Sequence, residues 1–276
     1  MKQLYSLHKI SVSLLLFFLF LKSSGIDGYR YVAGAPESGM AGSCVMKPDF
    51  WSSFYNQASL PFIRTRTFGI NYDNRFCLKE LGTGTAGLIF PSGRATLGVV
   101  CSHFGYKDFR RQSAAIACGL KLSGKTSAGI QIDYFRESFP GTENKTNSVT
   151  FEGGLLFDVT ENIRLGMHVF NPVPNSLRKN SLHSGLSAGA GIQLNKLFFA
   201  SAEVGMVTGE KIVIMTGIEY SAAENIRIRG GFRSENNSFS FGFGYEYRHV
   251  RLDLGFASHD RLGITSSASM ILQFKN

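Results

Sequence analysis

From Ser238 to Tyr247 the chain reads Ser-Phe-Ser-Phe-Gly-Phe-Gly-Tyr-Glu-Tyr, an alternation of aromatic residues with small or charged ones. Successive side chains of a β-strand point to opposite faces of the sheet, so this stretch predicts a strand with one aromatic face. The next stretch, 250–259, repeats the pattern, with leucine and phenylalanine on one face and Arg251 and Asp253 on the other. We expect Phe243 to lie on the aromatic face and Gly244, on the opposite face, to tolerate serine at little cost.

The same period of two recurs from residue 64 to the end of the chain, and no helical periodicity competes with it. The pattern predicts about 14 strands, at 64–73, 80–90, 94–104, 110–122, 126–136, 148–159, 163–170, 184–194, 197–207, 211–220, 226–233, 238–247, 250–259 and 263–274. Most of these segments have the length with which a tilted strand crosses a hydrocarbon layer. A soluble β-sandwich would usually have shorter strands.

The composition excludes several other classes of protein. The 276 residues are 43% hydrophobic and only 18% charged, with 31 Gly and 24 Phe. Soluble proteins average roughly 25% charged residues, and an apolar fraction made of Gly and Phe does not suit a coiled coil, a helical bundle or a disordered chain. Only one apolar run, near the N-terminus, approaches the length of a membrane-spanning helix.

That N-terminal run predicts an export signal. Lys2 and Lys9 lie before the apolar run 10–21, and small residues follow it at 23–25. We therefore expect a cleaved signal peptide over 1–25; an uncleaved anchor is the alternative, for which 12 apolar residues are short. The remaining chain has 26 basic and 20 acidic residues, a net charge of +6, without a basic cluster, so nucleic acid is not an expected partner.

The connections between the predicted strands alternate between tight turns and longer loops, as they do in outer-membrane barrels. A sheet with one lipophilic face must close on itself in lipid, because no water is present to satisfy an open edge. We expect an all-β fold, a transmembrane antiparallel β-barrel over 64–276, in the outer membrane of a Gram-negative cell. It would be a monomer in contact with outer-membrane lipid, with tight periplasmic turns and longer external loops.

Residues 26–63 precede the first strand and predict an N-terminal plug. A barrel of about 14 strands encloses a lumen too wide for Gly-rich inward faces to fill. Trp51, Phe54 and Tyr55 are too apolar to be left in water, and we expect Asn56 to form hydrogen bonds inside the barrel. A periplasmic tail is the alternative. Glycines inside strands, as in 82–87 and 189–191, are expected at close contacts with the plug or where the wall curves.

Charged residues on the inward face concentrate in the C-terminal half of the chain. They are Glu203, Glu219, Arg227, Arg229, Glu246, Arg251 and Asp253. They could line a polar path, or they could pair with one another and with the plug, because an unpaired buried charge is costly. We favour the structural interpretation.

The sequence predicts neither an enzyme nor a cofactor or metal site. His183 and Ser184 are adjacent in the chain and would point to opposite faces of a strand, so the histidine could not activate the serine. The four cysteines have no spacing typical of zinc sites.

Two stretches of the predicted plug, 34–42 and 49–60, resemble the N-terminal region of FadL-like outer-membrane proteins, particularly the PorV/PorQ branch of Bacteroidetes. Those proteins typically carry a small-residue G-A-R-x-x-x-M-G-x-A stretch, an acidic residue and an N-P-A-x-L segment. This chain has Pro36 in place of the usual Arg and Gln57 in place of the usual Pro. The resemblance implies a 14-stranded barrel with an N-terminal plug.

The resemblance also implies two alternative functions. The main expectation is an accessory barrel for type IX protein secretion or surface assembly, with secretion-system or surface proteins as partners, because the short external loops leave little room to capture a ligand. The alternative is a FadL-like channel for small hydrophobic molecules, which should have a lateral gap or a kinked plug.

Overall fold

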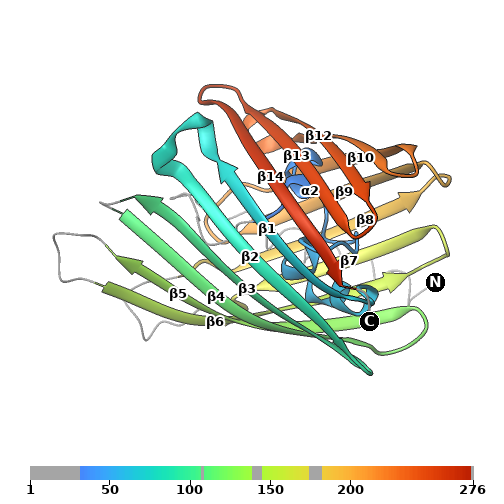
Figure 1. Ribbon diagram of the computed structural model, residues 1–276. Coiled ribbons are helices and arrows are strands. Elements are labelled where there is room, and N and C mark those ends of the chain that lie inside the picture. The colour runs from blue at the N-terminus through green and yellow to red at the C-terminus, as the bar shows by residue number, and fades with distance from the viewer. Residues whose placement is uncertain (1–31, 107–108, 139–144, 174–181, 275–276) are drawn as a thin grey trace, which may run out of the picture.

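The computed structural model describes residues 32–106, 109–138, 145–173 and 182–274. The fold is all-β, with fourteen antiparallel strands (Figure 1). The strands are β1 (Arg66–Asn74), β2 (Gly82–Ser92), β3 (Ala95–Tyr106), β4 (Phe109–Lys121), β5 (Thr126–Ser138), β6 (Lys145–Asp158), β7 (Ile163–Phe170), β8 (Gly185–Gln193), β9 (Phe198–Val207), β10 (Val213–Ala223), β11 (Ile226–Arg233), β12 (Ser238–Tyr247), β13 (Val250–His259) and β14 (Gly263–Phe274).

The sheet closes into a barrel in which every strand pairs with its neighbours in the sequence. Closure is made by β1 and β14, which pair from Arg66 opposite Phe274 to Asn74 opposite Ser266. The predicted barrel and its strand number are confirmed, and the predicted strand ends differ from the observed ones by at most three residues. Closure gives every strand two partner strands, as a lipid-facing sheet requires.

The two faces of the wall follow the sequence alternation. On β12 the exposed fraction is 66% for Phe239 and 53% for Phe241, whereas Ser240 between them is 8% exposed. Phe243 is exposed on the same outer face, as expected. Similar apolar residues cover the outside of the other strands, so the outer surface of the barrel is largely hydrocarbon.

The two ends of the barrel differ in their connections. At one end, here called the tight-turn end, strands are joined by two to four residues, as at Gly93 and Arg248, which both have positive φ. At the other, the long-loop end, β1 and β2 are joined through the 3-10 helices η4 (Arg75–Cys77) and η5 (Lys79–Leu81), and β11 and β12 through η6 (Ser234–Asn236). The expected signal peptide, residues 1–25, and parts of the two longest connections lie outside the described residues.

The segment before β1 lies inside the barrel. It contains the short helix α2 (Ala35–Gly39) and the 3-10 helices η2 (Ser52–Phe54) and η3 (Gln57–Phe62) (Figure 1, blue). It packs against inward-facing residues of the strands all around the wall. Over the part of the chain that the structure describes, no helix is long and apolar enough to span a membrane.

Candidate functional site

The inner wall meets the N-terminal segment along a ring of glycines, here called the glycine ring. Twelve of the fourteen strands each contribute one of its members. They are Gly69, Gly87, Gly98, Gly119, Gly129, Gly154, Gly166, Gly189, Gly217, Gly231, Gly242 and Gly255. Several are direct neighbours across the sheet, such as Gly119, Gly129 and Gly154 on β4, β5 and β6, so the ring runs around the wall.

Close backbone approach explains why these positions are glycine. A Cβ atom at Gly69 would lie 2.3 Å from Cε1 of Phe50, and one at Gly119 would lie 2.5 Å from the carbonyl oxygen of Gln57. Real Cβ contacts are not that short, so any side chain would push the N-terminal segment away from the wall. The inner wall and the N-terminal segment therefore have complementary surfaces.

The two strands without a ring glycine hold the segment by hydrogen bonds from serine. On β14, Ser269 accepts a hydrogen bond from the backbone N–H of Ala35 at 2.8 Å. On β9, the hydroxyl of Ser201 lies 2.9 Å from that of Ser43 and donates to the Ser43 carbonyl at 3.1 Å. The N-terminal segment therefore contacts all fourteen strands, twelve through glycine and two through serine.

The aromatic residues predicted for the plug lie inside this ring. Trp51 is fully buried and packs edge-on against Phe50, with ring centroids 4.8 Å apart. The ring of Phe54 lies against Gly87 of β2 and Gly98 of β3. These contacts place apolar surface of the segment against the wall; that they block the passage of solutes stays a prediction.

Tyr55 and Asn56 connect the segment to the wall by polar contacts. The hydroxyl of Tyr55 donates to Oε1 of Glu203 at 2.6 Å. Asn56 begins η3, where its Oδ1 accepts from the Ala58 N–H at 3.1 Å, and its Nδ2 donates to the Val45 carbonyl at 2.6 Å. The same Nδ2 lies 3.3 Å from backbone carbonyls of β6 and β7. Asn56 thus joins two turns of the segment to the wall.

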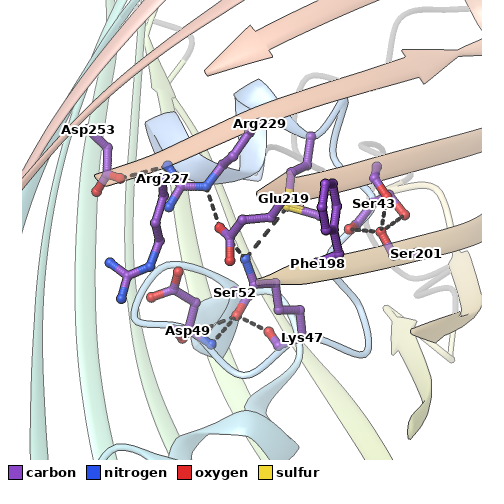
Figure 2. A network of polar contacts seen from close by, with 12 residues as sticks. Ser43, Lys47, Asp49, Ser52, Phe198, Ser201, Glu219, Arg227, Arg229 and Asp253 are labelled. Carbon is purple, nitrogen blue, oxygen red and sulfur yellow. Dashed lines mark hydrogen bonds and ion pairs between the residues drawn. The ribbon is translucent and has the colours of Figure 1, made fainter. Parts of the chain in front are cut away.

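Six charged side chains form a continuous chain between the segment and strands β10 to β13, here called the paired network. Figure 2 shows Lys47 and Arg229 converging on Glu219, each at 2.6 Å. The chain continues from Arg229 to Asp253 at 2.8 Å, from Asp253 to Arg251 at 2.8 Å and from Arg251 to Asp49 at 2.8 Å. Positive and negative groups alternate, three of each, so the network is electrically balanced despite its burial.

Two carboxyl groups of the N-terminal segment respond to this network in opposite ways. Burial alone would raise the pKa of Asp49, but the charges of Arg251 and Lys47 outweigh it and hold that pKa well below its usual range. Burial raises the pKa of Glu37 to about 8, and the charge of Asp49 adds to the rise while Arg251 opposes it. Glu37 therefore retains its proton at neutral pH, whereas Asp49 is ionised.

The predicted inward charges separate into three groups. Glu219, Arg229, Arg251 and Asp253 belong to the paired network. Glu203 instead accepts the backbone N–H groups of Cys44 at 2.9 Å and of Val45 at 2.8 Å, in addition to the Tyr55 hydroxyl. Arg227 and Glu246 pair with each other at 2.7 Å near the tight-turn end, with about a quarter of each side chain exposed.

The sequence did not identify Lys47 and Asp49, the residues of the segment that complete the paired network. Neither lies on a strand, so the alternation that marks inward-facing residues carries no information about them. The sequence holds two signals for them. Both lie within the predicted plug, next to the aromatic residues 50–55, and Asp49 begins the stretch 49–60 that resembles FadL-like proteins, which carry an acidic residue there.

A second polar group, here called the carboxylate–amide cluster, lies on β5, β6 and β7. Gln131 donates through Nε2 to Asp133 at 2.8 Å and to Glu152 at 2.5 Å. Glu152 also accepts from Nε2 of Gln57 at 2.8 Å and lies 3.1 Å from Nε2 of His168. Among the described residues, no lysine or arginine forms an ion pair with Asp133.

Over the described residues, the pairing of β6 with β7 stops short beside this cluster, on the side of the long-loop end; this is here called the interruption. Within the described residues β6 pairs with β7 only from Glu152, opposite Phe170, to Asp158, although β6 begins at Lys145. Asn171 follows with a positive φ of 47°, and its backbone N–H still donates to the carbonyl of Phe151 on β6 at 3.1 Å. Its side chain accepts from Thr150 at 2.8 Å and donates to the Leu182 carbonyl at 2.6 Å, so side-chain contacts accompany this last backbone hydrogen bond.

Comparison with known proteins shows likeness at the level of the fold. No family model and no curated protein matches the sequence. The toluene transporter TbuX of Ralstonia pickettii superposes with a TM-score of 0.67 at 11% identity, over 88% of this chain and 98% of that one. A FadL homologue of Pseudomonas aeruginosa superposes with a TM-score of 0.65 at 12% identity, also over 88% of this chain and 98% of that one. CymD, a monoaromatic hydrocarbon channel, gives 0.70 at 15% identity, again over 88% and 98%.

These three structures support the expected FadL-like barrel and none of them is a secretion protein. Identities of 11–15% establish a shared fold and nothing finer. The chain therefore has the 14-stranded barrel fold of the FadL-type hydrocarbon channels.

Proposed function

We propose that this protein is an outer-membrane channel that admits small hydrophobic molecules. The fold, the lipophilic outer face and the resemblance of residues 34–60 to FadL-like proteins all support an outer-membrane location. The tight-turn end would face the periplasm and the long-loop end the cell exterior, as the alternation of turn lengths predicts. The exported chain would lose residues 1–25 as its signal peptide.

The interruption between β6 and β7 is the observation that carries this proposal. A straight path along the barrel axis meets the N-terminal segment, which contacts twelve strands at the glycine ring and the other two through serine. A hydrophobic solute has a favourable alternative in the bilayer itself, because apolar surface is more stable in hydrocarbon than in water. The part of the wall where β6 lacks β7 as a partner is the natural place for such a solute to leave sideways.

The comparisons favour this channel over the secretion accessory that the sequence favoured. Two of the three structures reported above are described as a toluene transporter and a monoaromatic hydrocarbon channel. A lateral gap is expected of the channel, so the short pairing of β6 with β7 over the described residues favours the channel. The PorV/PorQ resemblance and the type IX role have no support beyond the sequence motif.

Uptake of radiolabelled toluene by Gram-negative cells that express the full chain tests the proposal. We expect an initial uptake rate several-fold above that of cells with an empty vector. Replacing Ser148, an inward residue of β6 beside the interruption, by Trp should lower this rate. Ser238→Trp is the matched control, since Ser238 is also a buried inward serine near the long-loop end but lies on β12.

Both variants must first show the mobility shift of a folded barrel on unheated gels. Uptake no faster than in empty-vector cells would refute the channel. Equal loss in Ser148→Trp and Ser238→Trp would refute the lateral route and leave an axial one.

A further inference from the structure

We propose that the carboxylate–amide cluster on β5 to β7 is a binding site for a primary ammonium group attached to a small apolar body. This inference deepens the proposed function, on which it rests for the way the ligand enters the barrel. It assigns to this chain amphiphilic amines as a ligand class.

Two buried acceptor atoms without a donor point to this ligand. Asp133 and Gln131 are 5% and 4% exposed and face the lumen. The amide of Gln131 donates to Oδ1 of Asp133 and to Glu152, which leaves Oδ2 of Asp133 and Oε1 of Gln131 without a hydrogen-bond partner among the described residues. Buried polar atoms are nearly always hydrogen-bonded, so a group that donates two hydrogen bonds is missing here.

The charge at the cluster indicates a cation. Asp133 has no ion-pair partner among the described residues, and Glu152 on the neighbouring strand carries the same sign. His168 lies 3.1 Å from Glu152. A buried carboxylate without a counter-charge is unfavourable, and an ammonium group would supply both the charge and the hydrogen bonds.

An aromatic pair next to the cluster suits the apolar body of such a ligand. Phe135 follows Asp133 by two residues on the same face of β5, and Phe170 lies opposite Glu152 on β7. The two rings are 6.3 Å apart, edge to face, and form a buried cluster with Leu182. Aromatic rings attract cations as well as apolar groups, so they complement both parts of an amphiphilic amine.

A metal ion fits the cluster less well. Calcium takes six to eight oxygen ligands and is typically held by several carboxylates. The described residues include no group of three or more His, Cys, Asp or Glu side chains arranged to hold a metal ion. An ammonium group needs only the acceptors that are present.

Calorimetric titration of the purified full-length barrel in detergent tests this site. The ligands are benzylamine and benzyltrimethylammonium, which has the same charge and ring but no N–H donor. We expect saturable binding of benzylamine and binding of benzyltrimethylammonium weaker by about tenfold or more, a difference of about 1.4 kcal/mol per factor of ten. Asp133→Asn should weaken benzylamine binding by a similar factor.

Asp73→Asn is the matched control for this substitution. Asp73 is an equally buried inward carboxylate on β1 and accepts a hydrogen bond from the Asn71 amide. Asp73→Asn should leave benzylamine binding unchanged, and both variants must retain the gel mobility of the folded barrel. Absence of saturable benzylamine binding, or equal weakening in the two variants, would overturn the inference. Toluene uptake tests the channel separately, so uptake without amine binding refutes only the amine site, and the reverse refutes only the channel.

Discussion

The two polar clusters in the lumen are built from similar residues and balanced in opposite ways. The paired network on β10 to β13 alternates three cations with three carboxylates through contacts of 2.6–2.8 Å. The carboxylate–amide cluster on β5 to β7 holds two carboxylates with amides and one histidine, and the described residues offer Asp133 no cation.

This difference separates two uses of buried charge in one barrel. Buried charges that compensate one another can join a segment to a wall and fix its register, which is the role we assign to the paired network. Buried acceptors that stay uncompensated are unfavourable in the unliganded protein, and they are commonly found where a ligand supplies what is missing. Breaking each cluster in turn should therefore give effects of different size and sign.

The largest effect is expected from removing the central cation of the paired network. Arg229→Met leaves Glu219 and Asp253 without their shared partner, and uncompensated buried charge of this kind costs about 3 to 5 kcal/mol. The measurement is the free energy of unfolding in urea, followed by gel mobility in lipid vesicles. Arg233→Met is the control, because Arg233 and Glu235 are 38% and 40% exposed and such pairs contribute less than about 1 kcal/mol. Similar losses in both variants would show that the network is not a special source of stability.

A smaller loss is expected at Gly244, where the sequence predicted tolerance. A Cβ atom there would lie 2.5 Å from Oδ1 of Asp253 and 2.9 Å from Nη1 of Arg229, inside the paired network. Gly244→Ala should cost about 1 to 3 kcal/mol, as overpacking usually does. Gly84→Ala is the control, since nothing lies within 4 Å of a Cβ at Gly84. A loss in the control as large as that in Gly244→Ala would mean that backbone conformation, and not the network, is responsible.

Gly244 also shows which parts of the molecule could be predicted from sequence. The barrel, its strands and the faces of Phe243 and Gly244 follow from a period of two, which is a local property of the chain. What lies behind an inward glycine depends on residues far away in sequence. The contacts at Gly244 therefore argue against the tolerance expected from the sequence, although its inward facing is as predicted.

The N-terminal segment shows the same limit more strongly. Its burial followed from an apolar composition that water would not tolerate, but its contacts come from irregular backbone that carries no periodicity. Lys47 pairs with Glu219 across 172 positions of sequence, and Asn56 contacts carbonyls of β6 and β7. An irregular segment has no repeating pattern that would align it with the strands, so only the folded structure could identify these partners. The sequence also could not show that Asp133 lacks a cationic partner among the described residues, because this depends on the side chains of neighbouring strands.

The raised pKa of Glu37, which lies near the paired network, predicts a pH dependence of stability. Its pKa is raised to about 8 in the folded protein from an ordinary value of 4.5, so the folded state holds a proton that the unfolded state has lost. Stability should therefore fall as pH rises from about 4.5 to about 8, with a slope of at most about 1.4 kcal/mol per pH unit, and level off above. Glu37→Gln should remove this slope while Asp49 stays ionised in both proteins. Unfolding free energies of the two proteins at pH 5, 6.5 and 8 provide the measurement, and parallel curves would refute the assignment.

The smallest effect, and the one of opposite sign, is expected from neutralising Asp133. Asp133→Asn replaces a buried carboxyl group that no described cation compensates, so in the absence of ligand it should leave stability unchanged or raise it by up to about 1 kcal/mol. The same change at Asp253 removes the partner of both Arg229 and Arg251 and should destabilise the barrel. Both substitutions replace aspartate by asparagine at positions with almost no exposure, so side-chain size does not enter the comparison. Unfolding free energies of the two variants, measured in the same vesicles without amine, give the sign directly. Equal destabilisation would mean that Asp133 has a compensating partner, as Asp253 has, and would refute the contrast between the two clusters.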